Sequence, residues 1–506
     1  MESEYTFKQI SDYGSVYSGS TDCDYDYHVT LPQYMEDLLK IVKCCVSPYV
    51  TGYEKSASEL KVYGKTHMEI IYISAADNSI KTYVYDEEFS KIISLSAECG
   101  DDALIRLKVV KRYDSSRVVN QRRFDVHLSF SLSLQVFART QHEIMGDCPQ
   151  LKQNLFSAKR LCLTNSVTDK IDFCEVVGNC DDGTKIKNII NTFYNIALTE
   201  INIVQDKALV KARLMLSLTY VTDAPVQEIR KFSSSVEISK IIDVPGISEN
   251  GQNHCCLSVQ NMTATARSDD NGELKIFEAA GSVQVCIDVY DEKEESFIVD
   301  AYCPKQKIEC SFEELNLCCP AENIADKTLF KSEVSFDGVS VSEIIDINVS
   351  CLKTEIESND SVKLKSQLLI ELLYKSADGE VLYIKKTEHL LYDTGLQEKN
   401  VGGNANIEFF SFDYVLTSEH SVELRIDAGV QALLYKSVRI YALKSFEIKE
   451  EDPRETPALV IYFSNPHENV WNIAKKFGSD MELIMRENDL ASPEIETKRI
   501  LMIPGI

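Results

Sequence analysis

Long runs of alternating apolar and polar residues dominate the chain. One run covers Val210 to Tyr220, and a similar one covers Val362 to Tyr374. Two longer runs cover Phe124 to Val136 and Val422 to Leu434. A period of two residues places one face of a segment in a core and the other in solvent, so these runs predict antiparallel β-strands.

The strand pattern is repeated along the sequence. Ser-Lys-Ile-Ile at 90–93 recurs at 239–242, and Ser-Leu-Gln-Val at 133–136 recurs as Ser-Val-Gln-Val at 282–285, at the same offset of 149 positions. In each copy an alternating strand reaches a tyrosine at an equivalent place, and these are Tyr72, Tyr220 and Tyr374. Copies of about 120 to 140 residues are too long for solenoid repeats, so each is expected to own a core.

Turn signals separate the predicted strands. They are Asp77-Asn78, Asp269–Gly272 and Asp378-Gly379, and such pairs favour tight turns. The alternation slips near Gly281, which predicts a bulge or bend. Helical periodicity is poor within the copies, so the predicted fold is mainly β: three tandem antiparallel, sandwich-like domains.

The predicted organisation also includes segments outside the three copies. The first residues are rich in tyrosine and acids, and they are expected to form either a mobile arm or an extra edge strand. Two prolines in a charged stretch predict a linker near the C-terminal end. The expected segments are the N-terminal arm 1–30, β domains at 31–160, 180–318 and 335–450, the linker 451–457 and a small domain at 458–506.

The small C-terminal domain has a different pattern, which predicts the order β-α-α-β. A short strand covers 458–463, and a closing strand covers 499–503. Asn469 is placed to cap a helix over 470–477, which Gly478 ends. Ser479 and Glu482 have the spacing of a capping box for a second helix that runs to about Glu487.

This tail resembles a LysM module. The matching residues are Val470-Trp471-x-Ile473-Ala474-Lys475-Lys476-Phe477-Gly478, Leu483-Ile484, Asn488 and Ile503-Pro504. The resemblance implies an α+β (βααβ) fold. It also implies binding of N-acetylglucosamine polymers such as peptidoglycan or chitin, in a groove between the loop after the first strand and the loop after the second helix. Trp471 is followed by Ile473-Ala474 on the predicted helix, which favours a core position over a sugar-stacking one.

The upstream copies resemble SPOCS domains, the tandem β domains of clostridial sporulation proteins. The resembling parts are the Ser-Lys-Ile-Ile strand, the strands that end in the three tyrosines, and Asp-Ala-Tyr-Cys-Pro at 300–304. Tandem SPOCS domains followed by one LysM resemble the spore coat morphogenetic proteins. That resemblance implies a cytoplasmic protein of the mother cell, located at the forespore surface. Its implied partner is the coat's basement-layer ATPase or another coat protein.

The predicted LysM loops depart from the glycan-binding pattern. His467-Glu468-Asn469 stand where Gly-Asp-Thr is usual, and Glu496-Thr497 stand where Pro-Gly is common. Bulk and charge in place of a glycine hinder the approach of a sugar to the backbone. We therefore expect a protein-binding edge, with glycan binding as the alternative, and His467 and Glu468 are expected to be exposed. The residues expected nearest to the partner or glycan are His467, Glu468, Asn469, Val470, Asn488, Asp489 and Leu490.

Composition narrows the possible partners. The 506 residues carry 53 Lys and Arg against 79 Asp and Glu, a net charge of −26, which disfavours nucleic acid and anionic membrane surfaces. No apolar run is long enough to span a membrane, and the acidic N-terminus lacks the apolar core of a secretory signal. The sixteen cysteines include no C-x-x-C, so we expect free thiols in a reducing compartment.

Catalytic and metal-binding motifs are also missing from the sequence. It has no nucleotide-binding glycine motif, no G-x-S-x-G and no H-E-x-x-H. His254-Cys255-Cys256 is the one His/Cys cluster, for which an exposed turn is the alternative to a metal site. The sequence therefore predicts a non-enzymatic scaffold with no catalytic residue, metal or cofactor. A peptidoglycan-binding protein localised by its LysM domain is the alternative function.

Overall fold

The computed structural model describes residues 5–95, 100, 102–180, 184–225, 227–247, 251–336, 338–449 and 457–505. Up to Ile448, the described chain forms three units of six strands that repeat one topology. The first unit contains β1 (Thr6–Thr30), β2 (Leu38–Lys55), β3 (Glu59–Ser74), β4 (Ile80–Ser94), β5 (Leu104–Asn120) and β6 (Arg123–Asp147). The second contains β7 (Lys152–Asn179), β8 (Ile186–Val204), β9 (Lys207–Thr222), β10 (Ile229–Asp243), β11 (Gln252–Ser268) and β12 (Leu274–Tyr302). The third contains β13 (Ile308–Ser335), β14 (Val341–Ser358), β15 (Val362–Ser376), β16 (Val381–Asp393), β17 (Val401–Ser418) and β18 (Ser421–Ile448).

Each unit is a sandwich of two antiparallel three-stranded sheets. In the first unit the sheets have the orders β2-β3-β4 and β1-β6-β5, and the other units repeat both orders with their own strands. Buried side chains from both sheets fill the space between them, in separate core clusters for the three units. The predicted fold class, three tandem sandwich-like β domains followed by a small α+β domain, is confirmed.

The alternating residues lie where the pattern predicts. Phe124, Val126, Leu128, Phe130 and Leu132 on β6 are fully buried. The residues between them are less buried, except Ser131, which is also buried. Burial of one face of a central strand is therefore the reason that this segment forms a strand in the middle of its sheet.

The three tyrosines occupy equivalent positions, as predicted. Tyr72 on β3, Tyr220 on β9 and Tyr374 on β15 are buried, and each lies two residues before the end of the central strand of its sheet. The Ser-Lys-Ile-Ile segments also correspond, because 90–93 lies on β4 and 239–242 lies on β10, the same edge strand of two units.

Residues 6–30 form β1, the edge strand of the first unit, and pair with β6 from Thr6 to Thr30. Of the two possibilities that the sequence left open, the structure has the edge strand. Residues 161–179 and 319–334, which the predicted domains leave out, lie within β7 and β13, the corresponding first strands of the other units. The repeated topology therefore divides the strands into three units, which cover residues 6–147, 152–302 and 308–448. The predicted domain boundaries stay a prediction. Of the predicted linker, residues 451–456 lie outside the described residues.

The slip of phase near Gly281 has a clear cause. The register between β11 and β12 shifts between Val259 and Asn261, so the bulge lies at Gln260 on the strand opposite Gly281. A Cβ atom on Gly281 would lie 2.4 Å from the carbonyl oxygen of Asn261. The predicted irregularity is therefore present, and the glycine is required by the close approach of the bulged backbone.

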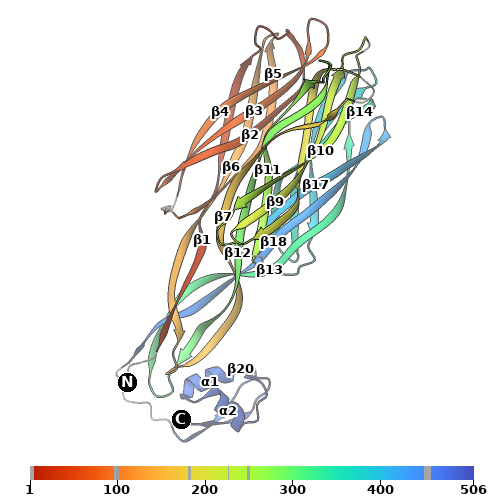
Figure 1. Ribbon diagram of the computed structural model, residues 1–506. Helices are drawn as coiled ribbons and strands as arrows, with labels where there is room; N and C mark the ends of the chain where they lie inside the picture. The colour runs from red at the N-terminus through yellow and green to blue at the C-terminus, as the bar shows by residue number, and fades with distance from the viewer. Residues whose placement is uncertain are drawn as a thin grey trace.

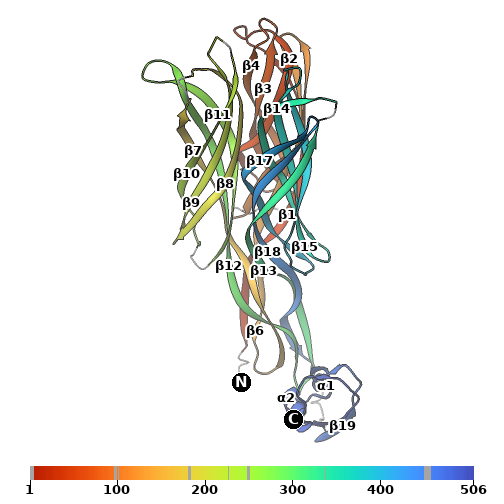
Figure 2. The same cartoon turned by 90° about the vertical axis from the view of Figure 1, so that its right-hand side faces the viewer.

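The first and last strands of each unit extend beyond the sandwiches and meet in a narrow stem (Figures 1 and 2). We define the stem as residues 6–12, 140–157, 295–317 and 438–448. Its apolar core combines side chains from all three units, including Ile144, Phe297, Leu315 and Ile440. A second cluster nearer the end of the stem includes Cys148, Ile298 and Leu443.

A small module follows at the tip of the stem (Figure 2). It comprises β19 (Leu459–Phe463), β20 (Glu468–Asn469), α1 (Val470–Phe477), α2 (Met481–Glu487), β21 (Glu494–Ile495) and β22 (Ile500–Pro504). β19 pairs with β22, and β20 pairs with β21. No helix in the described part of the chain is long and apolar enough to cross a membrane.

Candidate functional site

The first helix of the module forms as its sequence predicts. The Oδ1 atom of Asn469 accepts a hydrogen bond of 2.8 Å from the backbone N–H of Trp471, which caps the helix. Gly478 ends the helix with a φ of 66°, in the left-handed region that glycine adopts at low cost. The buried face of α1 presents Val470, Trp471 and Ile473 to the core of the module.

The second helix is capped by a different residue than predicted. Asp480, not Ser479, accepts hydrogen bonds from the backbone N–H groups of Glu482 and Leu483. The prediction of a capping box between Ser479 and Glu482 is therefore wrong. Ser479 is nearly fully buried, and its hydroxyl donates to the carbonyl of Pro504, so this side chain fastens β22 and not the helix.

The segment before α1 and the segment after α2 lie side by side, as the β-α-α-β order predicts. β20 pairs with β21, and the N–H of Val470 donates to the carbonyl of Pro493 over 2.8 Å. The N–H of His467 also donates to the carbonyl of Ile495 over 2.7 Å. These backbone bonds bring the expected binding residues of the two loops to one edge of the module.

The expected residues before α1 have different surroundings. The His467 side chain is 81% exposed, and its backbone has a φ of 65°. Glu468 was expected to be exposed but is only partly so, because its carboxylate accepts hydrogen bonds from the Asn465 backbone and from the hydroxyl of Tyr462. The bond from the Asn465 N–H lowers the pKa of Glu468. Val470 is fully buried and offers no side-chain surface to a partner.

The expected residues after α2 also divide into structural and exposed ones. Asn488 donates from Nδ2 to the carbonyls of Ile484 and Met502, and its Oδ1 accepts from the N–H of Met502 at 2.7 Å. Asp489 is exposed with a φ of 52°, and Leu490 packs against the core of the module. The exposed side chains of the predicted edge are therefore His467, Asn469 and Asp489, and Asn469 already caps α1.

Sequence reasoning missed a contact between the module and the stem. Trp471 is a core residue as predicted, but its core includes Tyr302 at the end of β12, and the two rings meet edge to face at 5.0 Å. The indole Nε1 donates to Asp300 Oδ2 over 2.8 Å, and Lys475 contacts the other oxygen of Asp300 at 2.5 Å. The Tyr302 hydroxyl donates to the carbonyl of Ser479 over 2.8 Å.

An ion pair at the start of α2 adds to this contact. Lys152, the first residue of β7, pairs with the capping carboxylate of Asp480. Burial alone would raise the pKa of Asp480, but Lys152 and the N–H groups of α2 more than offset it, so the pKa is lowered. Burial also raises the pKa of the Tyr302 hydroxyl. The module is thus fixed to the stem by apolar, hydrogen-bonded and ionic contacts together.

The sequence did carry a signal for this contact. Asp300 and Tyr302 belong to the Asp-Ala-Tyr-Cys-Pro segment that was singled out for its resemblance to SPOCS domains. Asp300 and Tyr302 lie two positions apart, so they share one face at the end of β12. A polar and an aromatic side chain on one face of a strand end indicate a contact with another part of the protein.

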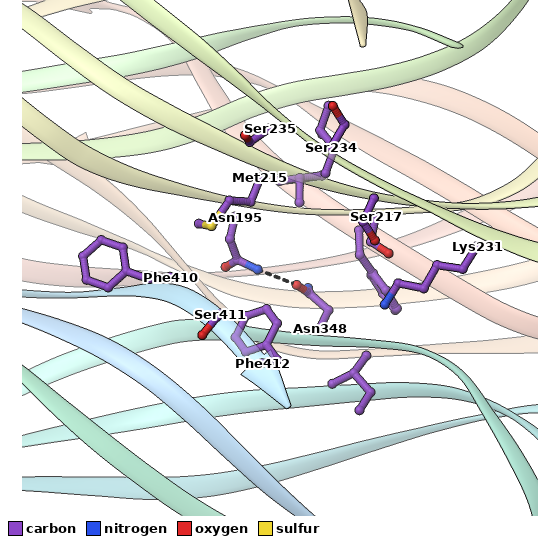
Figure 3. Close-up of a pocket in the computed structure, with 15 residues that line it drawn as sticks. Asn195, Met215, Ser217, Lys231, Ser234, Ser235, Asn348, Phe410, Ser411 and Phe412 are labelled. Atoms are coloured by element: carbon purple, nitrogen blue, oxygen red, sulfur yellow. Dashed lines mark hydrogen bonds between the residues drawn. The ribbon is translucent and has the colours of Figure 1, made fainter. Parts of the chain in front are cut away.

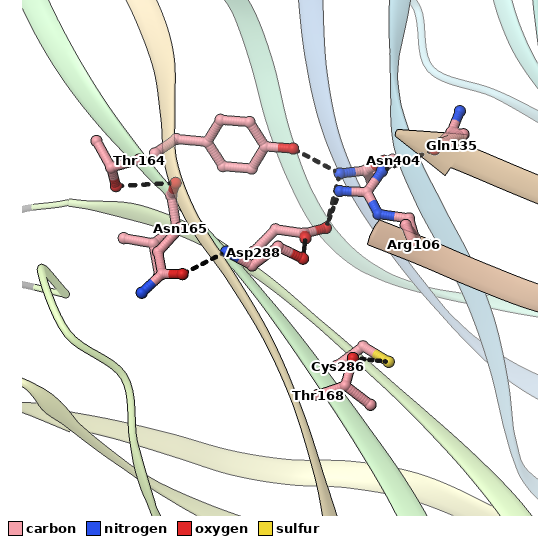
Figure 4. A network of polar contacts seen from close by, with 11 residues as sticks. Arg106, Gln135, Thr164, Asn165, Thr168, Cys286, Asp288 and Asn404 are labelled. Atoms are coloured by element: carbon pink, nitrogen blue, oxygen red, sulfur yellow. Dashed lines mark hydrogen bonds and ion pairs between the residues drawn. The ribbon is translucent and has the colours of Figure 1, made fainter. Parts of the chain in front are cut away.

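Other polar contacts join the three units to each other. Arg106 on β5 pairs with Asp288 on β12 at 2.5 Å and donates to Gln135 and Asn404, each at 3.1 Å (Figure 4). Asn404 on β17 in turn donates to the Tyr290 hydroxyl over 2.8 Å. The network therefore links all three units, and the Nη2 atom of Arg106 takes part in it through the ion pair with Asp288 and not through a hydrogen bond.

A cavity of about 380 Å³ lies between the second and third units. Asn195 donates to Asn348 across it over 2.8 Å (Figure 3). Lys231 pairs at 2.9 Å with Asp346, which also accepts from Ser217. Because the amides and the ion pair of its lining are already engaged, we interpret the cavity as part of the packing between units.

His254 lies within β11, so the expectation of an exposed turn is wrong. Its Nε2 atom is buried and has no hydrogen-bond partner in the described structure, and burial lowers its pKa to about 4. No group of three or more His, Cys, Asp or Glu side chains in the described ranges could hold a metal ion. The fifteen cysteines that the structure describes are free, while Cys99 lies outside the described residues.

Comparison with known families identifies two segments of the chain. Residues 185–266 match the family described as SipL, SPOCS domain, and residues 466–504 match the LysM domain family. The chain therefore carries a SPOCS domain of the SipL type and a C-terminal LysM domain, in the order that the sequence resemblance predicts. No curated protein and no solved structure matches the chain. Both domains are non-catalytic binding domains, and together they fit a sporulation-related protein with a domain of the peptidoglycan-binding type.

Proposed function

We propose that this protein is a non-enzymatic scaffold of sporulation that helps attach the spore coat to the forespore surface. It does so through protein–protein contacts in the mother-cell cytoplasm, and its LysM domain takes part in them. The partner proposed from the family resemblance is the basement-layer ATPase of the coat, with other coat proteins as further partners. The combination of a SipL-type SPOCS domain with a C-terminal LysM domain supports this function.

The observation that carries the proposal is that the polar side chains of the LysM loops are already engaged. Glu468 binds Asn465 and Tyr462, Asn469 caps α1, and Asn488 holds β22. A sugar in this place would have to displace those bonds or leave its own hydroxyls unpaired, at a cost of about 1–3 kcal/mol for each buried group. The loop edge is therefore better suited to a protein surface than to a glycan.

Binding of peptidoglycan is the second candidate function. The match of residues 466–504 to the LysM family favours it, and the sequence resemblance implies a glycan groove between the same two loops. Under this alternative the LysM domain itself localises the protein, and coat attachment is not its direct role.

The test uses the full chain, because the module shares its core with Tyr302 of the stem. The immobilised protein is offered the purified coat ATPase, and the free protein is pelleted separately with purified peptidoglycan. The informative variant is His467→Gly, which restores the usual glycine of a glycan-binding loop at an exposed position with a φ of 65°. Glycine removes the strain of that conformation, so the melting temperature should not fall.

We expect wild-type protein to capture the ATPase and to stay in solution when peptidoglycan is pelleted. His467→Gly should capture the ATPase several-fold less and be retained more by peptidoglycan, since a side chain is lost from the protein-binding edge. Strong pelleting of wild-type protein together with no capture of the ATPase would overturn the scaffold function and establish the alternative.

A further inference from the structure

The two-stranded sheet of the module exposes an apolar face. Leu459, Ile461 and Phe463 on β19 are 53%, 62% and 70% exposed, and Ile500 and Met502 on β22 are 64% and 45% exposed. They lie on the same side of the sheet, because Ile461 pairs with Met502 and Phe463 pairs with Ile500. The alternate residues Val460 and Tyr462, with Leu501 and Ile503, face the core of the module. A contiguous apolar surface of this kind marks an interaction site.

The backbone of β19 is also open to a further strand. The N–H of Ser464 donates to Arg499, and the N–H of Gly505 donates to Ala458, which places the ladder bonds at the even-numbered residues of β19. The N–H and C=O groups of Leu459, Ile461 and Phe463 therefore point away from β22. Among the described residues, no hydrogen bond to these outward groups is made.

The opposite edge of the sheet is treated differently. Met502 on β22 has its backbone N–H and C=O pointing outward, and the side-chain amide of Asn488 binds both, at 2.7 Å and 2.6 Å. Asn488 thus closes the edge of β22, whereas Ile461, the residue opposite Met502, has no such side chain beside it. Figure 2 shows β19 on the part of the module that is turned away from the stem, so the open edge is accessible. An open, apolar edge of this kind is a template for strand addition.

Positive charge lies at one end of this edge. Lys498 and Arg499 immediately precede β22, both are exposed, and neither makes an ion pair with a carboxylate in the described part of the chain. Arg499 is opposite Ser464, directly after Phe463, so the two cations mark the Phe463 end of β19. A segment bound along β19 would have acidic residues stabilised there.

We propose that β19 binds an extended segment of a protein partner by strand addition. The segment has apolar residues at alternate positions, which cover Leu459, Ile461 and Phe463, and acidic residues that lie beside Lys498 and Arg499. Backbone bonds to the outward groups of β19 supply affinity, and the apolar face supplies specificity. The edge is only about 17 Å long, too short for the roughly 1,600 Å² that a stable dimer interface buries, so a second copy of this chain fits it less well than a single partner segment.

This inference rests on the proposed protein-binding function of the module, and its test addresses the edge alone. The probe is a fluorescent synthetic peptide that alternates valine with threonine and ends in two glutamates, titrated into the full chain. The variant Ile461→Pro removes the outward N–H and blocks an incoming strand without removing a bond to β22, since proline is tolerated at that face of an edge strand. The matched control Ile461→Thr keeps the N–H and shortens the side chain. The fluorescence and thermal melting of each variant check that the module is folded.

We expect the peptide to bind wild-type protein and to bind Ile461→Pro about threefold to tenfold more weakly, because one backbone hydrogen bond is lost. The affinity of Ile461→Thr should lie between those of wild type and Ile461→Pro. If the proline variant does not fold, Lys498→Glu with Arg499→Glu decides: it should weaken binding of the acidic peptide and strengthen that of a matched peptide that ends in two lysines. Equal binding of both peptides by all folded variants would overturn the proposal. Sedimentation of wild-type protein as a dimer that Ile461→Pro makes monomeric would overturn it too, because the occupant would then be a second copy. Capture of the coat ATPase equally by wild type and Ile461→Pro would leave the scaffold function standing and remove strand addition alone.

Discussion

Replacing Asp300 by alanine should release the module from the stem while leaving the module folded. Asp300 is the one stem carboxylate that binds both Trp471 and Lys475 in the described structure. Its removal leaves the buried indole N–H of Trp471 without an acceptor at the contact between the module and the stem. Val470, Ile473 and Ile484 form the remaining core of the module and do not contact the stem through this bond.

The expected magnitude follows from the two contacts. A hydrogen bond from a neutral donor to a carboxylate contributes about 1.5–3 kcal/mol, and most of that is lost because the indole stays buried. Lys475 has a side chain that is 44% exposed, so its ion pair contributes at most about 1 kcal/mol. The docked state should therefore lose about 2–4 kcal/mol relative to the released state, which favours release by a factor of about 30 to 1,000.

The chain offers a direct assay, because Trp471 is its only tryptophan. Release should expose one face of the indole, so the emission of Asp300→Ala should shift to longer wavelength and acrylamide should quench it more strongly. Two controls separate the contacts. Asp300→Asn keeps an acceptor for the indole, and Lys475→Met keeps the carboxylate, so each should give a smaller shift than Asp300→Ala.

The reasoning would be refuted by an Asp300→Ala protein whose emission, quenching and hydrogen exchange over residues 457–505 equal those of wild type. It would also be refuted if the module unfolded in this variant, because the docking contact would then be part of its fold. Trp471→Ala does not test docking, since loss of a buried tryptophan costs about 3–5 kcal/mol and should unfold the module itself.

Three further outcomes follow from the structure. Gly281→Ala should lower the free energy of unfolding by about 1–3 kcal/mol, because a Cβ there would lie 2.4 Å from the carbonyl of Asn261. Gly52→Ala, where nothing lies within 4 Å, should change it by less than about 0.5 kcal/mol in the same denaturant titration. Thiol titration under denaturant, after an anaerobic preparation without reductant, should count close to all sixteen cysteines. A set of protected cysteines would contradict the proposed reducing compartment. Burial raises the pKa of Glu408 from 4.5 to about 7. The protonated carboxyl therefore contributes fully to stability below pH 4.5, and this contribution is lost as the pH rises to about 7. Glu408→Gln should remove this pH dependence of stability, which amounts to up to about 3 kcal/mol, from melting curves recorded between these pH values.

Much of the fold could be predicted because burial on one face of a strand has a period that the sequence displays. Phe124, Val126 and Leu128 alternate without a break, and all three are fully buried on β6. The helix α1 could be predicted equally well from the sequence, since its cap, its buried face and its terminal glycine are local features. Segments whose structure is decided by neighbours in the sequence were therefore predicted correctly.

The errors arise where a side chain has two possible partners. Ser479 and Asp480 are adjacent and both can cap a helix, and the choice was made by the carbonyl of Pro504, 25 residues away. Glu468 was expected in solvent, but Tyr462 and Asn465 draw its carboxylate inward. Helix and strand propensities predict neither outcome, because each depends on a specific hydrogen bond, with a distant partner for Ser479 and with nearby partners for Glu468.

The docking contact shows the same limit over a longer distance. Trp471 was assigned to a core on the basis of its helix, and that is correct, yet part of the core comes from Tyr302, and the two residues are linked only by the way the units meet in the stem. The first and last strands of each unit are longer than the sandwiches need, and the extra length builds the stem that carries Asp300, Tyr302 and Lys152 to one end. Because those strand ends fix the orientation of α1 and α2, they also determine that β19 is turned away from the rest of the chain. The stem, built from all three units, therefore holds the LysM module at α1 and at the start of α2 and leaves the edge of β19 outside this contact.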